Sequence, residues 1–478
     1  MVTSHEGFQA LERGELEQAE AIFALRLRKD PSDTDALHGL ALICFERNNT
    51  ELAEALLRMV LQRKPRVVDV RCDLARIFLA SARYSEALEI LDFDADPLSI
   101  RSEVYLLRGN AFRAIGRLED ALRCYDRGYM PEHQVEFSIN RVNVLTDLKR
   151  FDEAETLMKS ITTEFPNNDH AIFNASLLHL RLGHWAAGWP LQEKRASKKT
   201  FDQGWQLGKL FENIQKAVGD RVMPRALLYA EQGLGDVIQY IRFLNLPGFR
   251  SCCLTVQVPT ALAALVKINF SDVSVETDLS VLEQDFDFRC SLMSIPAAAG
   301  FKNEADFFSE PYLKAPSSRV SELRKVVRGS EARRCIGIQW RGGKNPKLAN
   351  RSMPIEFLSD LIRADYRSVS LRQSPSEEES RWLDSHDLVR LDSLMNNFVD
   401  TAAVIQNLDV VVTVDTSIAH LAGAMGVPTL LLLPYSAAWV WMEDRSDSPW
   451  YPSITVIRQP SPGDWHSCIA EASRRLHS

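Results

Sequence analysis

Two patterns of apolar and polar residues divide the chain near residue 190. Before this point apolar residues recur at helical spacing, as at Leu57 and Val60, between polar stretches. From Pro224 onward, short runs of consecutive apolar residues alternate with segments of helical pattern. The first pattern predicts helices throughout, and the second predicts strands that alternate with helices.

The helical part repeats at a nearly constant period. One small residue recurs every 33 or 34 positions, at Ala19, Ala53, Ala87, Ala121, Ala154 and Gly188. Five positions before each of them we expect a turn, at Gly14, Asn48, Ala82, Gly116, Lys149 and Gly183. Proline stands twelve positions after three of them, at Pro31, Pro65 and Pro166. Each period therefore predicts two antiparallel helices that approach closely at the small residue and stack on the next pair.

This period resembles the tetratricopeptide repeat, an α-helical superhelix that binds peptides or proteins, whereas an irregular helical bundle is the alternative interpretation. The resemblance implies a protein partner for residues 1–190 without identifying it. Residues 191–223 are interpreted as a connector. Its basic residues, Lys194, Arg195, Lys198 and Lys199, are expected to be solvated.

The second half predicts two series of strands. Those of residues 224–315 are expected at 226–230, 254–258, 273–277 and 286–290, and those of residues 316–478 at 335–340, 368–371, 410–414 and 429–433. Strands that alternate with helices form parallel sheets covered on both faces, so we expect two Rossmann-like lobes. Open sheets of this kind bind ligands at the carboxyl ends of their strands, where the candidate chemistry should lie.

Composition and charge indicate which class of partner and which cellular compartment to expect. The net charge is −8, which argues against a nucleic-acid partner. None of the eight cysteines stands in a Cys-x-x-Cys pair, so we expect reduced thiols. No apolar run approaches the roughly 18 residues that span a membrane, and residues 1–20 lack an apolar export segment. These features predict a cytoplasmic protein without a membrane span.

A glycine-containing turn follows the first strand expected in the second half. It holds Gln232, Gly233, Gly235 and Gln239, interpreted as an acceptor-side loop because glycines allow a substrate to approach the backbone closely. Asp236 stands at the start of the following helix. Its carboxylate could accept a proton as a general base, or it could only cap the helix.

A polar triplet, Asp415, Thr416 and Ser417, follows the strand expected at 410–414 and precedes an apolar helix. This order marks a helix N-terminus, whose free N–H groups and macrodipole suit a phosphate or diphosphate. His420, one turn further, could face the same site. An ordinary helix cap and a core histidine are the alternative interpretations.

Two further segments carry candidate chemistry. Arg341, Gly342, Gly343 and Lys344 follow another expected strand, with Arg351 soon after, and suit a leaving phosphate or form a solvated basic loop. Many aromatic residues lie in 434–441 and 447–452. They form either a structured loop beside a ligand or part of the core, since each ring can bury a large area.

Taken together, these residues resemble GT-B glycosyltransferases that carry tetratricopeptide repeats. The resemblance is closest to the branch that is related to heptosyltransferases and implicated in flagellin glycosylation. It depends most on residues 231–236, 414–428 and 447–452. It implies a catalytic role for Asp236 and a donor-phosphate motif that comprises Asp415, Thr416, Ser417 and His420, with Ser417 in place of a glycine. Arg341 and Lys344 would assist the leaving phosphate.

The implied reaction is an inverting, metal-independent transfer from a nucleotide sugar to a Ser or Thr hydroxyl of a protein, such as flagellin, selected by the repeats. The nucleotide sugar is a co-substrate of unknown identity, for which a CMP-linked nonulosonic acid is one candidate. No other cofactor is expected. Two alternatives remain: a non-catalytic repeat scaffold, and a transferase that acts on lipopolysaccharide-type glycans.

Overall fold

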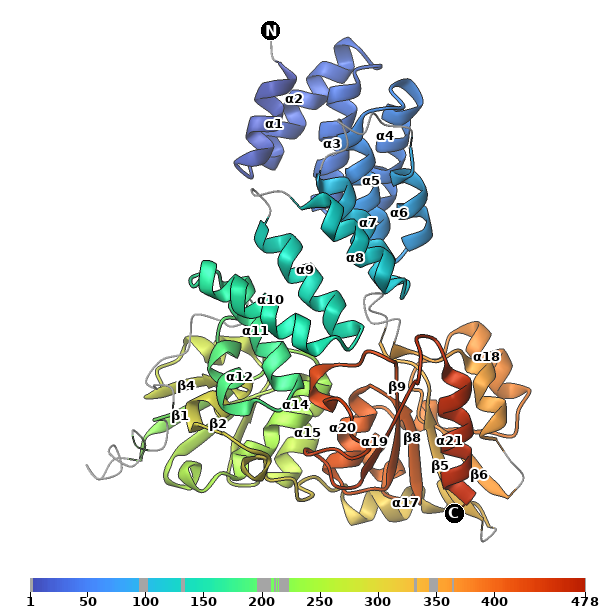
Figure 1. The fold of residues 1–478 in the computed structure, drawn as a ribbon. Helices are drawn as coiled ribbons and strands as arrows, with labels where there is room; N and C mark the ends of the chain where they lie inside the picture. Colours follow the sequence, from blue (N-terminus) through green and yellow to red (C-terminus); the bar gives the residue numbers. More distant parts are fainter. Residues whose placement is uncertain are drawn as a thin grey trace. The chain divides into compact units, whose positions relative to one another are not determined.

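The computed structural model describes residues 3–93, 102–129, 134–195, 208, 209, 212, 214, 223–330, 333–343, 351–362 and 365–477. Contacts divide the chain into two compact units, Met1–Ile161 and Thr162–Ser478. The N-terminal part is helical and the C-terminal part contains parallel sheets, which confirms the predicted α + α/β class (Figure 1). None of the described helices is both long and apolar enough to cross a membrane.

The first unit is built from consecutive pairs of helices. Their bounds are α1 (Ser4–Glu12), α2 (Leu16–Lys29), α3 (Thr34–Glu46), α4 (Thr50–Arg63), α5 (Val68–Ala80), α6 (Tyr84–Leu91), α7 (Ser102–Ala114), α8 (Leu118–Gly128), α9 (Gln134–Asp147) and α10 (Phe151–Glu164), which extends into the second unit. The second helix of a pair contacts the first helix of the next: α2 contacts α3, α4 contacts α5, α6 contacts α7, and α8 contacts α9. This stacking is typical of repeat proteins.

The predicted turn residues all adopt left-handed backbone conformations. The φ angles at Gly14, Asn48, Ala82, Gly116, Lys149 and Gly183 lie between 57° and 79°. Such a residue ends the first helix of a pair and satisfies its last carbonyl groups. The small residues five positions later lie on the second helices and are buried. The period read from the sequence is therefore confirmed.

The second unit begins with a further helix pair, α11 (Asp169–Arg181) and α12 (Trp185–Gln192). A four-stranded parallel sheet follows, in the order β3-β2-β1-β4. Its strands are β1 (Arg225–Tyr229), β2 (Cys253–Gln257), β3 (Ser274–Glu276) and β4 (Phe288–Ser291), and its helices include α14 (Leu234–Tyr240), α15 (Thr260–Asn269) and α16 (Ile295–Ala299). The four predicted strands of this lobe are confirmed within one or two residues.

The second lobe contains a six-stranded parallel sheet in the order β10-β9-β8-β5-β6-β7. Its strands are β5 (Arg334–Gln339), β6 (Tyr366–Ser370), β7 (Val389–Arg390), β8 (Val410–Val414), β9 (Thr429–Leu433) and β10 (Ile454–Arg458). The sequence did not predict the edge strands β7 and β10. The associated helices are α17 (Ser317–Arg328), α18 (Glu377–Asp384), α19 (Phe398–Ile405), α20 (Ser417–Ala424) and α21 (Trp465–His477).

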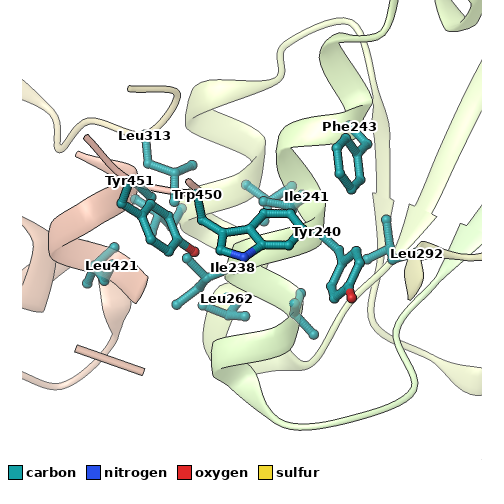
Figure 2. Close-up of a cluster of buried hydrophobic side chains, with 14 of the residues drawn as sticks. Ile238, Tyr240, Ile241, Phe243, Leu262, Leu292, Leu313, Leu421, Trp450 and Tyr451 are labelled. Carbon is teal, nitrogen blue, oxygen red and sulfur yellow. The ribbon is translucent and has the colours of Figure 1, made fainter. Parts of the chain in front are cut away.

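One hydrophobic core continues from the last helix pair through both lobes. The indole of Trp450 lies among the side chains of α14 (Figure 2). It stacks on Phe307 of the first lobe at 4.0 Å between ring centroids and meets Trp185 and Trp189 of α12 edge-on. These rings join α12 and the two lobes into one packed body.

One expectation for the connector is wrong. Arg195, predicted to be solvated, has a side chain that is 1% exposed and lies in an ion pair. The neighbouring Lys194 is half-exposed and pairs with Asp169. Lys198 and Lys199 lie outside the described residues.

Candidate functional site

The candidate site lies where a helix of each lobe begins. α14 follows the carboxyl end of β1, and α20 follows the carboxyl end of β8. The two helices contact each other directly. A Cβ atom at Gly235 would lie only 2.9 Å from Cδ2 of His420. The glycine at 235 thus permits this helix contact, whereas the sequence suggested that it admits a substrate.

Asp236 lies in the first turn of α14. Its Oδ2 accepts a hydrogen bond from the N–H of Gly233 at 3.1 Å, so it caps the helix as one interpretation predicted. Burial and the negative charge of Asp415 raise the pKa of Asp236 to about 6, although the Gly233 N–H and Arg351 act in the opposite direction. A carboxyl group with this pKa changes its protonation state close to neutral pH and is suited to proton transfer.

Asp415 directly follows the strand β8 and is largely buried. Its Oδ2 lies 3.0 Å from Nη1 of Arg351, with which it forms an ion pair. The next residue, Thr416, is the N-cap of α20, because its Oγ1 accepts a hydrogen bond from the N–H of Ile418 at 3.2 Å. Ser417 is the first residue of that helix. The predicted helix N-terminus is therefore present.

His420 lies one turn into α20 and is 7% exposed. Its Nδ1 lies 3.0 Å from the hydroxyl group of Tyr451, and its ring packs on Trp441 at 5.0 Å. Burial lowers the pKa of His420 to about 4, in spite of the charge of Asp415. The imidazole is therefore neutral at physiological pH and cannot provide positive charge there.

Two described basic residues of the loop after β5 pair with different carboxylates. Arg341 is half-exposed, and its Nη1 lies 3.9 Å from Glu379. Arg351 is the cation that pairs with Asp415. The backbone returns beside the strand end, since the N–H of Met353 donates to the carbonyl of Trp340 at 2.8 Å. Lys344 lies outside the described residues.

The sequence had placed Arg351 beside the basic loop without including it among the donor-binding residues. The available signal was its position shortly after Gly342–Gly343, but its partner Asp415 is distant in the sequence. Of the predicted acceptor-side loop, Gln232 and Gly233 are exposed. Gln239 lies within α14 and is 1% exposed, so its side chain belongs to the interior.

The aromatic segment near the C-terminus serves mainly packing. Trp441, Trp450 and Tyr451 are fully buried. Arg242, also buried, donates from Nη1 to the carbonyl of Trp450 at 2.7 Å and lies over the ring of Tyr451 at 4.6 Å. This segment therefore fixes the position of the helix α14 relative to α20, and with it the distance between the two candidate motifs.

Comparisons with known proteins found matches for both the N-terminal and the C-terminal part of the chain. Residues 395–463 match the model of glycosyltransferase family 9 (heptosyltransferase), which includes β8 and the segment from Asp415 to His420. Residues 9–68 match a tetratricopeptide-repeat model. Protein FlbA of Caulobacter vibrioides is 22% identical over 478 residues, a region that covers 91% of this chain and 77% of FlbA.

Two solved structures are similar to part of the chain. PilF of Pseudomonas aeruginosa is 20% identical, with 37% of this chain and 81% of that chain covered and a TM-score of 0.33. A thermophilic TPR protein of Thermus thermophilus is 21% identical, with 36% and 95% covered and a TM-score of 0.31. By its family-model matches, the chain has tetratricopeptide repeats at its N-terminus and a glycosyltransferase family 9 domain at its C-terminus, and it is similar to Protein FlbA.

Proposed function

We propose that the chain is an inverting, metal-independent glycosyltransferase of the GT-B type, which moves a sugar from a nucleotide-sugar donor to a Ser or Thr hydroxyl of a protein. One observation supports this proposal most: Asp236 of the first lobe lies close to Asp415 and to the N-terminus of α20 in the second lobe. A general base and an anion site then face each other at the carboxyl ends of β1 and β8.

Asp236 is the proposed base. With a pKa of about 6 its carboxyl group is mostly ionised at pH 7.5 and can accept the proton of an acceptor hydroxyl. The hydroxyl oxygen attacks the anomeric carbon and forms the new glycosidic bond. The bond from that carbon to the phosphate oxygen breaks, its electron pair leaves with the phosphate, and the configuration inverts.

The leaving phosphate would be stabilised by the N-terminus of α20. The positive end of its macrodipole favours negative charge, and the backbone N–H and the hydroxyl of Ser417, its first residue, can donate to a phosphate. Arg351 supplies a cation at the same place, while Arg341 and Lys344 are further candidates on the adjacent loop. These groups supply the positive charge that a metal ion supplies in other transferases.

The repeats support a protein acceptor, because such arrays bind peptides or proteins. Flagellin is the candidate acceptor and the cytoplasm the candidate location. A labelled nucleotide sugar and co-expressed flagellin would test this by a change in flagellin mass. Label that appears only in lipopolysaccharide would contradict the protein acceptor and favour the glycan-modifying alternative.

The donor can be identified by a thermal-shift panel of UDP, GDP, ADP, CMP and CDP. Stabilisation by one nucleotide is expected, because binding to the folded state raises the melting temperature. CMP would point to a monophosphate leaving group and a nonulosonic acid. Failure of all five would contradict the enzyme and favour the scaffold.

The role of Asp236 can be separated from helix capping with a matched control. Asp306 also caps a short helix of the first lobe, where its Oδ2 accepts from the N–H of Asn303 at 3.0 Å. We expect Asp236→Asn and Asp236→Ala to lose transfer activity at least about 100-fold, as removal of a general base does. Asp306→Asn should retain it. Equal activity of wild type and a folded Asp236→Ala protein would remove Asp236 as the base.

A further inference from the structure

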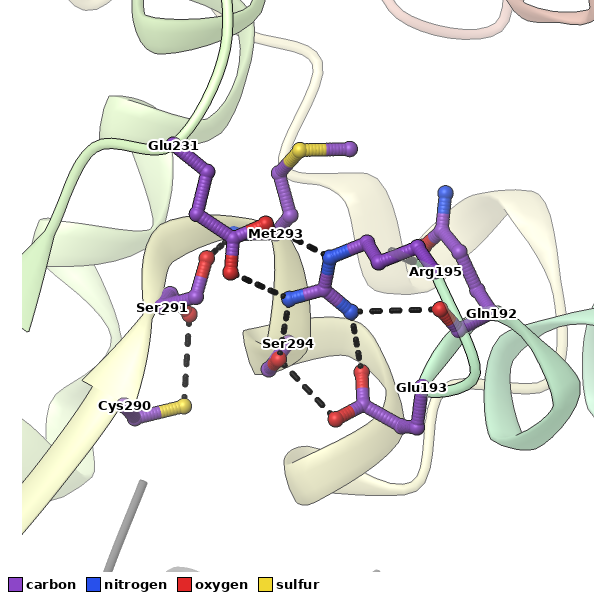
Figure 3. Close-up of polar contacts among 8 residues, drawn as sticks. All are labelled: Gln192, Glu193, Arg195, Glu231, Cys290, Ser291, Met293 and Ser294. Atoms are coloured by element: carbon purple, nitrogen blue, oxygen red, sulfur yellow. Dashed lines mark hydrogen bonds and ion pairs between the residues drawn. The ribbon is translucent and has the colours of Figure 1, made fainter. Parts of the chain in front are cut away.

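A buried arginine connects the last helix pair to the loop that carries Asp236 (Figure 3). Arg195 follows α12, and its guanidinium group binds Glu231 through two parallel hydrogen bonds. Nε lies 2.6 Å from Oε2, and Nη2 lies 2.8 Å from Oε1. The side chains are 1% and 0% exposed, respectively. Two buried side chains from segments 36 residues apart in sequence are thus held in one geometry.

The guanidinium group is itself held from the other side. Its Nη1 donates to Oε1 of Glu193 at 2.9 Å, and its Nη2 donates to Oγ of Ser294 at 2.7 Å. Ser294 in turn donates to Oε2 of Glu193 at 3.0 Å. The carbonyl of Gln192 accepts from Nη1 at 3.2 Å. Because a planar guanidinium group with several fixed partners has little rotational freedom, it sets the position of Glu231.

Glu231 lies between the end of β1 and the first turn of α14. On the strand side, the N–H of Ala230 donates to the carbonyl of Gln257 at 3.1 Å. On the helix side, Gly233 is the N-cap of α14 and Gly235 lies in its first turn, and both glycines restrict the backbone less than other residues. The ion pair at Glu231 is therefore a buried side-chain contact that can compensate for the freedom of these glycines, together with the hydrogen bond from the N–H of Gly233 to Asp236.

We infer that Arg195 is a positioning residue for Asp236, which holds the loop of residues 231–236 in its working conformation through Glu231. The inference rests on the proposed function of Asp236 as the base. The last helix pair is then part of the catalytic apparatus as well as the end of a binding array. Lysine cannot replace Arg195 fully, because an ammonium group lacks the two parallel donors.

Three variants test this role. Arg195→Lys keeps the charge, and Arg195→Met leaves Glu231 without its ion pair. The double variant Arg195→Met/Glu231→Gln removes both charges. Arg319→Met is the control, because Arg319 pairs with Asp400 at 2.8 Å within the second lobe and away from this loop.

Hydrogen–deuterium exchange of the peptide over residues 230–240 is the readout that needs no substrate. We expect exchange to rise at least about tenfold in all three Arg195 variants and to stay unchanged in Arg319→Met. Nucleotide release from a panel of UDP-, GDP-, ADP- and CMP-linked sugars is the second readout. In this assay kcat of the Arg195 variants should fall at least tenfold, with little change of KM for the donor. Relative to Arg195→Met, the double variant should regain melting temperature but not kcat.

The outcomes separate this inference from the proposed function. If Arg195→Lys and Arg195→Met show the same hydrogen exchange and the same kcat as wild type while Asp236→Asn is inactive, the inference is overturned and the proposed function is not. Recovery of both melting temperature and kcat in the double variant would also overturn it, since the ion pair would then serve stability only. An Asp236→Asn protein as active as wild type would overturn the proposed function.

Discussion

Gly235 in α14 lies against the imidazole of His420 in α20, so that the two lobes meet at a glycine and a buried, neutral histidine. A Cβ atom at 235 would lie 2.9 Å from Cδ2 of His420, closer than side-chain carbons normally approach. His420 cannot move easily, because Tyr451 holds its Nδ1 and Trp441 packs on its ring. The separation of Asp236 and Asp415 therefore depends on the absence of a side chain at 235.

Gly235→Ala should displace α14 from α20. We expect a loss of about 1–3 kcal/mol in stability, as for other overpacked cores, and at least a tenfold fall in transfer activity. Gly233→Ala is the matched control, because the nearest group to its Cβ is Oδ2 of Asp236 at an ordinary 3.4 Å. Thermal denaturation and activity of both variants check this. A larger effect at 233 than at 235 would contradict the close approach to His420.

Tyr451→Phe removes the hydroxyl group that binds Nδ1 of His420 at 3.0 Å. We expect a loss of about 1–3 kcal/mol, because a buried polar atom is left without that partner, and weaker nucleotide binding in a thermal-shift assay. Tyr366→Phe removes a buried hydroxyl that donates to the carbonyl of Leu476 at 2.8 Å, far along the sheet in β6. The control should lose similar stability but keep nucleotide binding, and equal binding in both variants would argue against a role for His420.

Local rules predicted much of this fold from the sequence. Asn48, Ala82 and Lys149 occupy left-handed turns although they are not glycines, and the constant period alone located them. The beginnings of α14 and α20 were visible because Asp236 and Thr416 are typical residues of a helix start. These features depend on neighbours within a few residues, which a sequence displays directly.

Contacts between distant residues were not predicted. Arg195 was interpreted as solvated because it stands in a short basic run. Its partner Glu231 is 36 residues away, and nothing local indicates that both are buried. The same holds for Arg351 and Asp415. The strands β7 and β10 were not predicted from the sequence, because β7 has only two residues and β10 closely follows the proline-containing aromatic segment at 447–452.

The pH dependence of transfer should report Asp236. Since the base must be ionised, kcat is expected to rise about tenfold per pH unit below pH 6 and to level off above it, with a midpoint near the pKa of about 6. An initial-rate profile between pH 4.5 and pH 8.5 measures this. The residual activity of Asp236→Asn should not show this rise with pH. If that variant keeps a midpoint near pH 6, the titrating group is not Asp236.

Stability should change over the same pH range. Because the pKa of Asp236 rises from 3.8 to about 6 on folding, the folded state binds this proton more tightly than the unfolded chain. Its contribution is therefore fully present below about pH 4 and is lost as the pH rises through 6, by up to about 3 kcal/mol. Asp236→Asn should thus be more stable than wild type at pH 8, and the difference in denaturation should shrink towards pH 4. A pH-independent difference would contradict the raised pKa.

Arg351→Met should weaken the donor site more than Arg341→Met. Arg351 pairs with Asp415 at 3.0 Å, whereas Arg341 is half-exposed and 3.9 Å from Glu379. The loss of a charged contact of about 1.5–3 kcal/mol corresponds to about 10- to 100-fold in nucleotide affinity, and the Arg341 variant should lose less than about threefold. Because Arg351 also lowers the pKa of Asp236, its removal should move the midpoint of the pH profile upward. Titration with the stabilising nucleotide measures the first effect and initial rates measure the second. A greater loss of affinity in Arg341→Met, with an unchanged midpoint in Arg351→Met, would instead place the phosphate on the exposed side of the loop.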